Sequence, residues 1–361
     1  MKITNAAVWE LAEKERQGRL QAQELTECVH AITGSIEDYA SDADHGILTM
    51  LKKLCVKMEM PEETARMLRN IAMHHFYRKN VENAVKYINQ ALRISRDLKF
   101  SNLHIMLLSD KGLILFYDLK YKAAKKLYSQ AFELLPHTHD LDNRTRHLLY
   151  YRTGILYGYM GDYAGSYQML NEALKYAESV TDTGWVLVNM GVLHERQGQY
   201  DEALNQYDAA LKLYGEDYSV ERSSVYNNIA QVYKDLEEYE IALKNIGEAF
   251  ELLGCKNMSK FFIFFQTYTE IKILQGEAEE ELQKLVGLIK QVKDFFVYKC
   301  FVVDGINTLM KTSSRDKQVL SELSDEIAAI VDDIGCRNKE YKKELNSFLS
   351  DICLSLRVLS L

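Results

Sequence analysis

A repeat of about 40 residues recurs five times along the chain and constrains the fold more than any other feature. The copies begin at Ala65, Ile105, His147, Gly184 and Ser223, so successive starts lie 40, 42, 37 and 39 residues apart. Each copy has small residues at its eighth and twentieth places, alanine at its twenty-seventh, and tyrosine or valine at its seventeenth. Small residues at helical spacing let two helices pack closely. Each copy is therefore predicted to form a helical hairpin.

This pattern resembles the tetratricopeptide repeat, which has Gly or Ala at place eight, Tyr at seventeen, Ala at twenty and twenty-seven, and Pro at thirty-two. The copy from Ile105 meets almost the whole pattern and ends at Pro136. Gly161 and Gly198 stand two places before the tyrosine, where a left-handed turn favours glycine. We therefore predict an all-α fold, a right-handed superhelical solenoid of tetratricopeptide-like hairpins.

The sequence on either side of the repeats is helical in pattern but irregular. Residues 1–64 are predicted to form an N-terminal helical segment, residues 65–255 the five repeats, and residues 256–361 a degenerate repeat with C-terminal capping helices. Terminal repeats are commonly irregular because they cap the stack. No linker rich in Ser, Pro or Gly separates these parts, so we expect one continuous solenoid.

Charge and composition exclude several classes of function. The net charge of −8 argues against a general affinity for nucleic acid, which needs a concentrated positive field. No apolar stretch reaches the roughly 20 residues that a membrane-spanning helix needs, and no secretory leader is recognisable. The six cysteines are scattered without a paired spacing, as in proteins of reducing compartments. We expect a cytoplasmic protein.

Motifs for catalysis are missing from the sequence. The chain has no phosphate-binding loop, no nucleophile elbow, no dinucleotide-binding glycine pattern and no zinc-protease motif. Its closely spaced histidines have no cysteine-rich or acidic partner motif. We expect no catalytic residue, no bound metal and no cofactor.

Place six of the repeat carries a polar residue in all five copies. These residues are Asn70, Asp110, Arg152, Asn189 and Asn228. Place six lies between apolar packing places of the first helix, and in a tetratricopeptide-like hairpin that helix faces the groove. A polar residue there in every copy would be unusual for a core position. We predict that these side chains line the groove.

An asparagine amide both donates and accepts hydrogen bonds, as the backbone of an extended peptide requires. Neighbouring places add five candidates for the same peptide site: Arg69, Tyr151, Trp185, Asn227 and Gln231. Two interpretations of place six remain open. The side chains bind a short peptide, or they bond to neighbouring helices and fix the stacking of the repeats. For Arg152, an ion pair with an acid from a neighbouring helix is equally well supported.

Among proteins with such long repeats, the chain resembles the bacterial peptide-pheromone receptors grouped as Rap, NprR and PlcR. The resemblance rests on irregular repeats near 40 residues, a preceding helical segment, a similar overall length, and the asparagines at place six. It implies a quorum-sensing regulator that binds a small signalling peptide. It also implies that Asn189, Asn228 and Asn70 contact the main chain of that peptide.

Residues 1–64 distinguish the two branches of this group. PlcR-like members begin with a helix-turn-helix DNA-binding domain, whose Gln-x-x-Leu-Ala helix and Gly-containing turn are not found in these residues. The resemblance is therefore closer to the Rap branch. It implies a response regulator or a transcription factor as the protein partner, and it leaves a homodimer open. A phosphatase-type activity is implied by resemblance only, and no residue can be assigned to it.

Two other functions fit the same repeats. The chain could be a constitutive scaffold or adaptor that binds an extended segment of a partner. It could also be a regulator from a DNA-binding family that acts through partner proteins. In both cases the repeats would serve as a protein-binding surface, because fold alone does not specify function.

Overall fold

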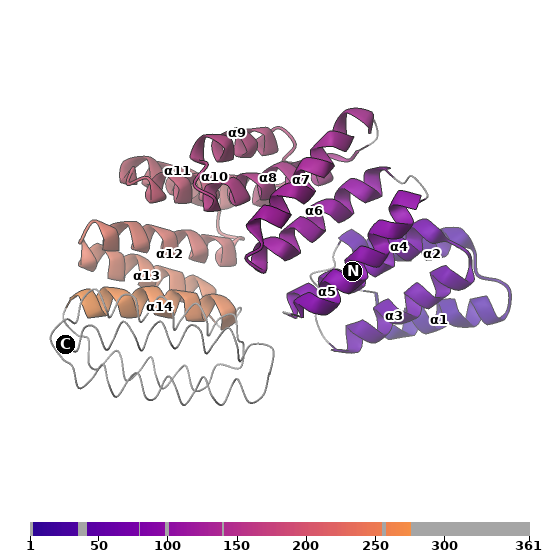
Figure 1. The fold of residues 1–361 in the computed structure, drawn as a ribbon. Helices are drawn as coiled ribbons and strands as arrows, with labels where there is room; N and C mark the ends of the chain where they lie inside the picture. The colour runs from indigo at the N-terminus through magenta and orange to yellow at the C-terminus, as the bar shows by residue number, and fades with distance from the viewer. Residues whose placement is uncertain are drawn as a thin grey trace, which may run out of the picture. The chain divides into compact units, whose positions relative to one another are not determined.

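The computed structural model describes residues 3–34, 42–78, 80–97, 101–138, 141–254 and 258–275, and these residues form α-helices joined by turns, with no strand among them (Figure 1). The helices are α1 (Asn5–Arg16), α2 (Ala22–Gly34), α3 (Asp42–Lys57), α4 (Pro61–Tyr77), α5 (Val81–Asp97), α6 (Ser101–Tyr117), α7 (Tyr121–Leu134), α8 (Asn143–Tyr159), α9 (Tyr163–Leu174), α10 (Val180–Arg196), α11 (Tyr200–Tyr214), α12 (Ser219–Asp235), α13 (Tyr239–Leu253) and α14 (Met258–Leu274). A 3-10 turn, η2 (Leu135–His137), follows α7. The predicted all-α class is confirmed. No helix in the described ranges has both the length and the apolar character that crossing a bilayer requires.

The chain divides into two compact units, and the division lies between Leu193 and His194, within α10. We call them the first unit and the second unit. The predicted start of the repeats at residue 65 falls inside α4, which begins at Pro61 because proline suits the first position of a helix. Most of the predicted C-terminal part, residues 276–361, lies outside the described residues.

The N-terminal helices share a core with the first repeat. Met67 and Ile71 of α4 are buried in one cluster with Leu25 of α2 and Leu51 of α3. Burial of large aliphatic side chains contributes roughly 1.5–3 kcal/mol each, so this contact fixes α1–α3 on the first hairpin. The segment is therefore a continuation of the stack rather than a tethered module.

Small residues hold the two helices of each hairpin together, as the repeat pattern predicts. The side chains at places twenty and twenty-seven are fully buried in every copy: Ala84, Ala91, Ala124, Ala131, Ser166, Ala173, Ala203, Ala210, Ala242 and Ala249. Ser166 is the one polar member, and its hydroxyl donates to the carbonyl of Gly154 across the hairpin at 2.6 Å. Alanine-sized side chains are needed because larger ones would force the helices apart.

The residue at place eight is matched to the side chain at place twenty-four. A methyl group added at Gly112 would overlap the ring of Tyr128. At Gly154, an added methyl carbon would lie 2.8 Å from Cγ of Leu170. Both glycines therefore make room for a large side chain of the second helix.

Where place twenty-four is isoleucine, place eight is alanine. Ala72 shares a buried cluster with Ile88, and Ala230 shares one with Ile246. The repeat thus keeps the summed volume of the two positions within narrow limits, as close packing requires.

The turn between the two helices of a hairpin places one residue in the left-handed region. Gly161 and Gly198 have φ of 81° and 71°, which confirms the predicted glycine turns. Leu119 and Glu237 occupy the same place in other repeats, with φ of 58° and 62°. A residue with a Cβ atom is strained in this conformation, so these two turns are less favourable than the glycine turns.

Candidate functional site

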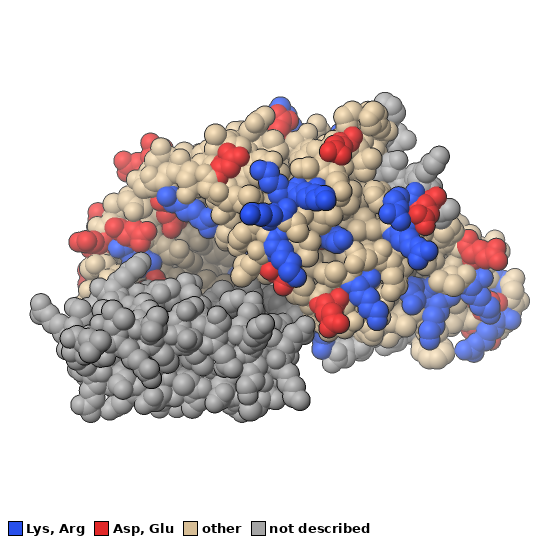
Figure 2. Space-filling model, in the orientation of Figure 1, with Lys and Arg blue, Asp and Glu red and all other residues tan. Residues whose placement is uncertain are grey.

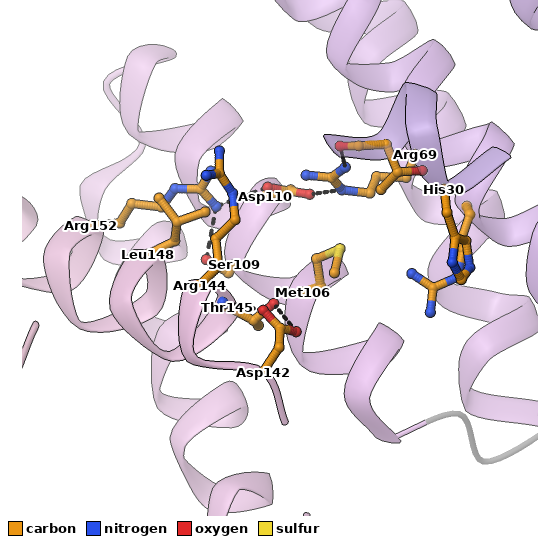
Figure 3. Close-up of a pocket in the computed structure, with 12 residues that line it drawn as sticks. His30, Arg69, Met106, Ser109, Asp110, Asp142, Arg144, Thr145, Leu148 and Arg152 are labelled. Atoms are coloured by element: carbon orange, nitrogen blue, oxygen red, sulfur yellow. Dashed lines mark hydrogen bonds and ion pairs between the residues drawn. The ribbon is translucent and has the colours of Figure 1, made fainter. Parts of the chain in front are cut away.

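A cavity of about 260 Å³ opens in the first unit, between α2 and the first helices of three successive hairpins, α4, α6 and α8 (Figure 3). Its lining residues are His30, Thr33, Arg66, Arg69, Met106, Ser109, Asp110, Asp142, Arg144, Thr145, Leu148 and Arg152. Four of them are arginines and two are aspartates, so the lining has a formal charge of +2 with histidine neutral. The cavity can therefore attract an anionic group.

A buried ion-pair triad forms one wall of this cavity. Figure 3 shows the Asp110 carboxylate lying between Arg69 and Arg152, which come from different hairpins. Nε of Arg69 donates to one carboxylate oxygen, and Nη1 of Arg152 donates to the other at 2.8 Å. The Asp110 side chain is 1% exposed, and those of Arg69 and Arg152 are 9% and 11% exposed. The triad therefore joins α4, α6 and α8.

The electrostatics of the triad keep Asp110 ionised. Burial by itself would raise the pKa of this carboxyl group, because it penalises the charged form. The positive charges of Arg69 and Arg152, and the hydrogen bonds that they donate, outweigh burial and lower the pKa below its ordinary value. Asp110 is thus an anion at neutral pH and compensates one of the two guanidinium charges.

Three of the four place-six side chains of the first unit share a pattern of bonding. Each of these three bonds to the residue at place five of the preceding repeat. The pairs are Asp110 with Arg69, Arg152 with Ser109 at 2.9 Å, and Asn189 with Tyr151 at 2.9 Å. These contacts join successive hairpins, which is the stacking interpretation of the polar place. The structure therefore brings together six of the predicted residues in two groups of three: Arg69, Asp110 and Arg152 around Asp110, and Tyr151, Trp185 and Asn189 around Asn189. Asn70 lies apart from both groups and bonds to Thr33 of α2.

Asn189 lies in a partly aromatic cluster on α8 and α10. Its Nδ2 atom donates to the Tyr151 hydroxyl and to the Trp185 carbonyl, each at 2.9 Å. The Tyr151 and Trp185 rings lie with centroids 6.2 Å apart and an interplanar angle of 29°. Asn189 is half-buried, and within the described residues its Oδ1 atom accepts no hydrogen bond. Asn189, which the sequence predicts to bind a peptide, therefore still has one acceptor available.

Asn70 and Asp110 are enclosed by the packing. Both are fully buried. Nδ2 of Asn70 donates to the Thr33 hydroxyl of α2 at 3.0 Å, and its Oδ1 atom is buried with no partner in the described part of the chain. Neither side chain can contact a peptide on the surface of this conformation, because an extended ligand needs exposed donors and acceptors.

The remaining predicted residues, Asn227, Asn228 and Gln231, lie on α12 in the second unit. Asn227 is 3% exposed, and its Oδ1 atom is buried with no partner among the described residues. Asn228 and Gln231 are half-buried, and neither side chain forms a hydrogen bond within the described ranges. The two amides are three residues apart and therefore lie on the same side of the helix.

Polar contacts between α12 and α14 flank these amides along the helix. The ammonium of Lys260 donates to the Ser224 hydroxyl at 2.5 Å, and that of Lys234 donates to Glu270 at 2.7 Å. Burial lowers the pKa of the Lys260 ammonium, with partial compensation from the charge of Glu221. The side of α12 that carries the amides is therefore polar over three turns.

Two features of the cavity were beyond sequence reasoning. His30 and Thr33 come from α2, which carries no repeat pattern, and Arg144 and Asp142 come from the start of α8, before the third repeat begins. The only signal in the sequence was the recurrence of arginine near place six, which alone does not place a cavity. No group of three or more potential metal ligands in the described residues is arranged to hold a metal ion.

Comparisons with known proteins agree with the hairpin architecture. The family model described as tetratricopeptide repeat matches residues 63–137, 145–216 and 182–253, which together make up about half of the chain. The photosystem I assembly protein Ycf3 of Rippkaea orientalis (strain PCC 8801 / RF-1) is 33% identical over 85 residues. That match covers 24% of this chain and 46% of Ycf3, so the chain spans about half the length of this relative.

Two solved structures extend the comparison. The apo form of RapI aligns with a TM-score of 0.58 at 15% identity, over 92% of this chain and 97% of RapI. BtubC (BKLC) from P. vanneervenii aligns with a TM-score of 0.45 at 14% identity, over 65% of this chain and 93% of BtubC. The similarity to RapI is a similarity of fold.

Proposed function

The chain belongs to the tetratricopeptide repeat family, and from that premise we propose that it binds a short linear peptide along the first helices of its hairpins and thereby controls its contact with a second protein. The fold similarity to RapI and the resemblance of the repeats to Rap-type receptors support a regulatory role. By that resemblance, the second protein is a response regulator or a transcription factor. The proposed role is binding, without a catalytic step.

The amide pair on α12 carries this proposal. Asn228 and Gln231 each offer donors and an acceptor that the described residues leave unbonded. A peptide backbone supplies the complementary N–H and C=O groups at regular spacing. A half-buried amide has a poor supply of water partners, so a peptide that bonds to it gains more than at an open surface.

A matched pair of variants tests the proposal. Peptides of about five to eight residues are screened for binding to the full chain, and the affinity of a hit is measured by isothermal titration calorimetry. Asn228→Ala should weaken binding by about 1–3 kcal/mol, roughly 5- to 150-fold, because a buried peptide group loses its partner. Asn245→Ala on α13 is the control, since that exposed amide bonds only to the carbonyl of Ile241 within its own helix. Equal affinities of the two variants would count against the proposal.

A constitutive adaptor is the alternative function. In that case the chain holds the extended segment of its partner directly, and no second protein responds to the peptide. The two functions differ in linkage, because a regulatory peptide must change the affinity for the second protein. A pull-down of candidate partners from cell extract, with and without the peptide that binds, separates them: a constant yield favours the adaptor.

A further inference from the structure

We propose that the cavity between α2, α4, α6 and α8 binds a carboxylate group, so that the segment bound by this protein is acidic. This inference deepens the proposed function, on which it rests for the nature of the ligand as a peptide. It concerns a site in the first unit, whereas the amide pair lies in the second unit.

The imbalance of charge in the triad is the first argument. Arg69 and Arg152 are both largely buried, and Asp110 is the only carboxylate that pairs with either of them in the described structure. One positive charge is therefore left without a counter-charge at a largely buried position. Because an unpaired buried charge is unfavourable, the wall of the cavity is suited to one further anion.

Unused donors at the cavity are the second argument. Both hydrogen bonds that Arg152 donates come from its Nη1 atom. Its Nε and Nη2 atoms therefore have no partner within the described residues. Arg144 is exposed and forms no ion pair or hydrogen bond there, and Nε of Arg66 is buried without a partner. Guanidinium groups bind carboxylates through two parallel N–H bonds, so these donors match that ligand.

The acidic groups near the cavity are already engaged. The Asp142 carboxylate caps α8, where it accepts from the backbone N–H and the hydroxyl of Thr145, each at 2.8 Å. Glu62, which lies next to the cavity, accepts from Nη2 of Arg66 at 2.7 Å and is therefore paired as well. With Glu62 included, the cavity still has a formal charge of +1.

The surface of the first unit also carries positive charge. Helix α7 carries Lys122, Lys125 and Lys126 against the single acid Glu133. In Figure 2, Lys and Arg side chains gather on the face where Figure 1 places α7. A local positive region on a chain of net charge −8 can attract an acidic ligand, while the net charge disfavours nucleic acid.

Two variants and one control test the inference on the full chain. Arg152→Lys keeps the positive charge beside Asp110 but removes the forked donors, and Arg144→Gln removes an exposed cavity charge without touching the core. Arg93→Gln on α5 is the charge-matched control, since its side chain is 80% exposed and lies outside the cavity. Thermal unfolding of all three establishes that they fold.

The probe is acetyl-pentaglutamate amide, with acetyl-pentaglutamine amide as its neutral counterpart, titrated by calorimetry at about 0.15 M ionic strength. Pentaglutamate should bind at least tenfold more tightly than pentaglutamine. Arg152→Lys should lose about tenfold in affinity for pentaglutamate and Arg144→Gln about threefold, while Arg93→Gln stays unchanged. Acetyl-pentaglutamine with a free carboxyl end tests whether a C-terminal carboxylate serves as well as a side chain.

Equal binding of all three probes would overturn the inference, as would equal losses in the three variants. Tight binding of the free-carboxyl probe alone would support it with the C-terminus as the source of the carboxylate. The result is separable from the proposed function. If Asn228→Ala has no effect while the arginine variants weaken binding, the proposed peptide path fails and the carboxylate site stands; the reverse pattern removes the carboxylate site alone.

Discussion

In the first unit the place-six side chains Asp110, Arg152 and Asn189 are bonded to neighbouring hairpins, whereas in the second unit Asn228 has no hydrogen bond within the described residues. The same place of the same repeat thus has two uses. Bonded side chains stabilise the stack, and an unbonded one is available to a ligand.

Within the first unit, the residue at place five of the preceding repeat supplies the hydrogen-bond partner of place six. Arg69, Ser109 and Tyr151 each have a side-chain group that can bond to place six of the next repeat. The residue that stands at this place before Asn228 is Val188, whose side chain has no donor or acceptor. A polar residue at place six is therefore a weaker sequence signal of a binding residue where place five of the preceding repeat is polar as well.

The largest expected effect is that of breaking the triad. Asp110→Asn should reduce the free energy of unfolding by about 3–5 kcal/mol, because it leaves two buried guanidinium groups without a counter-charge. Urea denaturation of the full chain measures the loss. Asp208→Asn is the control, since that exposed carboxylate pairs only with Lys212 of its own helix and should cost less than about 0.5 kcal/mol.

The same triad gives a dependence on pH. In the folded state, the pKa of Asp110 lies below the ordinary value of about 4, so this carboxyl group binds protons more weakly than it does in the unfolded state. Its contribution to stability is fully present above about pH 4 and is lost as the pH falls through the folded pKa. In Asp110→Asn this part of the acid dependence should disappear; an unchanged acid profile would argue against the ion pairs.

The next effect concerns the pairing of places eight and twenty-four. Gly112→Ala should destabilise the chain by about 1–2 kcal/mol, because the overlap with the Tyr128 ring outweighs the gain of about 1 kcal/mol in helix propensity. The double variant Gly112→Ala, Tyr128→Ile has the same residue types at places eight and twenty-four as the Ala72–Ile88 pair. A double-mutant cycle should show a favourable coupling of about 1 kcal/mol or more, and strict additivity would exclude volume matching.

A smaller effect tests the stacking role of Asn189. Tyr151→Phe removes the hydroxyl that accepts from Asn189 while keeping the ring beside Trp185. The expected loss is about 0.5–1.5 kcal/mol in the free energy of unfolding. Tyr163→Phe removes a hydroxyl with no hydrogen bond among the described residues and should change stability by less than about 0.5 kcal/mol. Equal losses in the free energy of unfolding for the two variants would refute the stacking role of Asn189.

The smallest effect compares the two kinds of turn. Leu119→Gly should stabilise the first unit by about 0.5 kcal/mol, because relief of left-handed strain exceeds the added entropy of the unfolded chain. Gly161→Ala, at the same place of the next repeat, should destabilise it by about 1 kcal/mol. If stability changed in the same direction in both variants, the left-handed conformation of the turn would not be the cause of the changes.

The repeat itself specified the hairpins. Small side chains at places eight, twenty and twenty-seven, with glycine in the turns, allow only a close antiparallel pairing of helices, and Gly154 with Ser166 shows that pairing in the structure. These are local relations between residues some ten to twenty positions apart, so the sequence alone could reveal them.

Tertiary structure decided which polar residues are free. The partners of Asn70, Asp110 and Asn189 come from 37 to 42 residues away along the chain, across helix faces whose rotation the sequence does not fix. The cavity also needs α2, which carries no repeat pattern. A side chain with hydrogen-bonding capacity bonds to whatever group lies within reach, and only the packing of whole hairpins determines whether that group is a neighbour or a ligand.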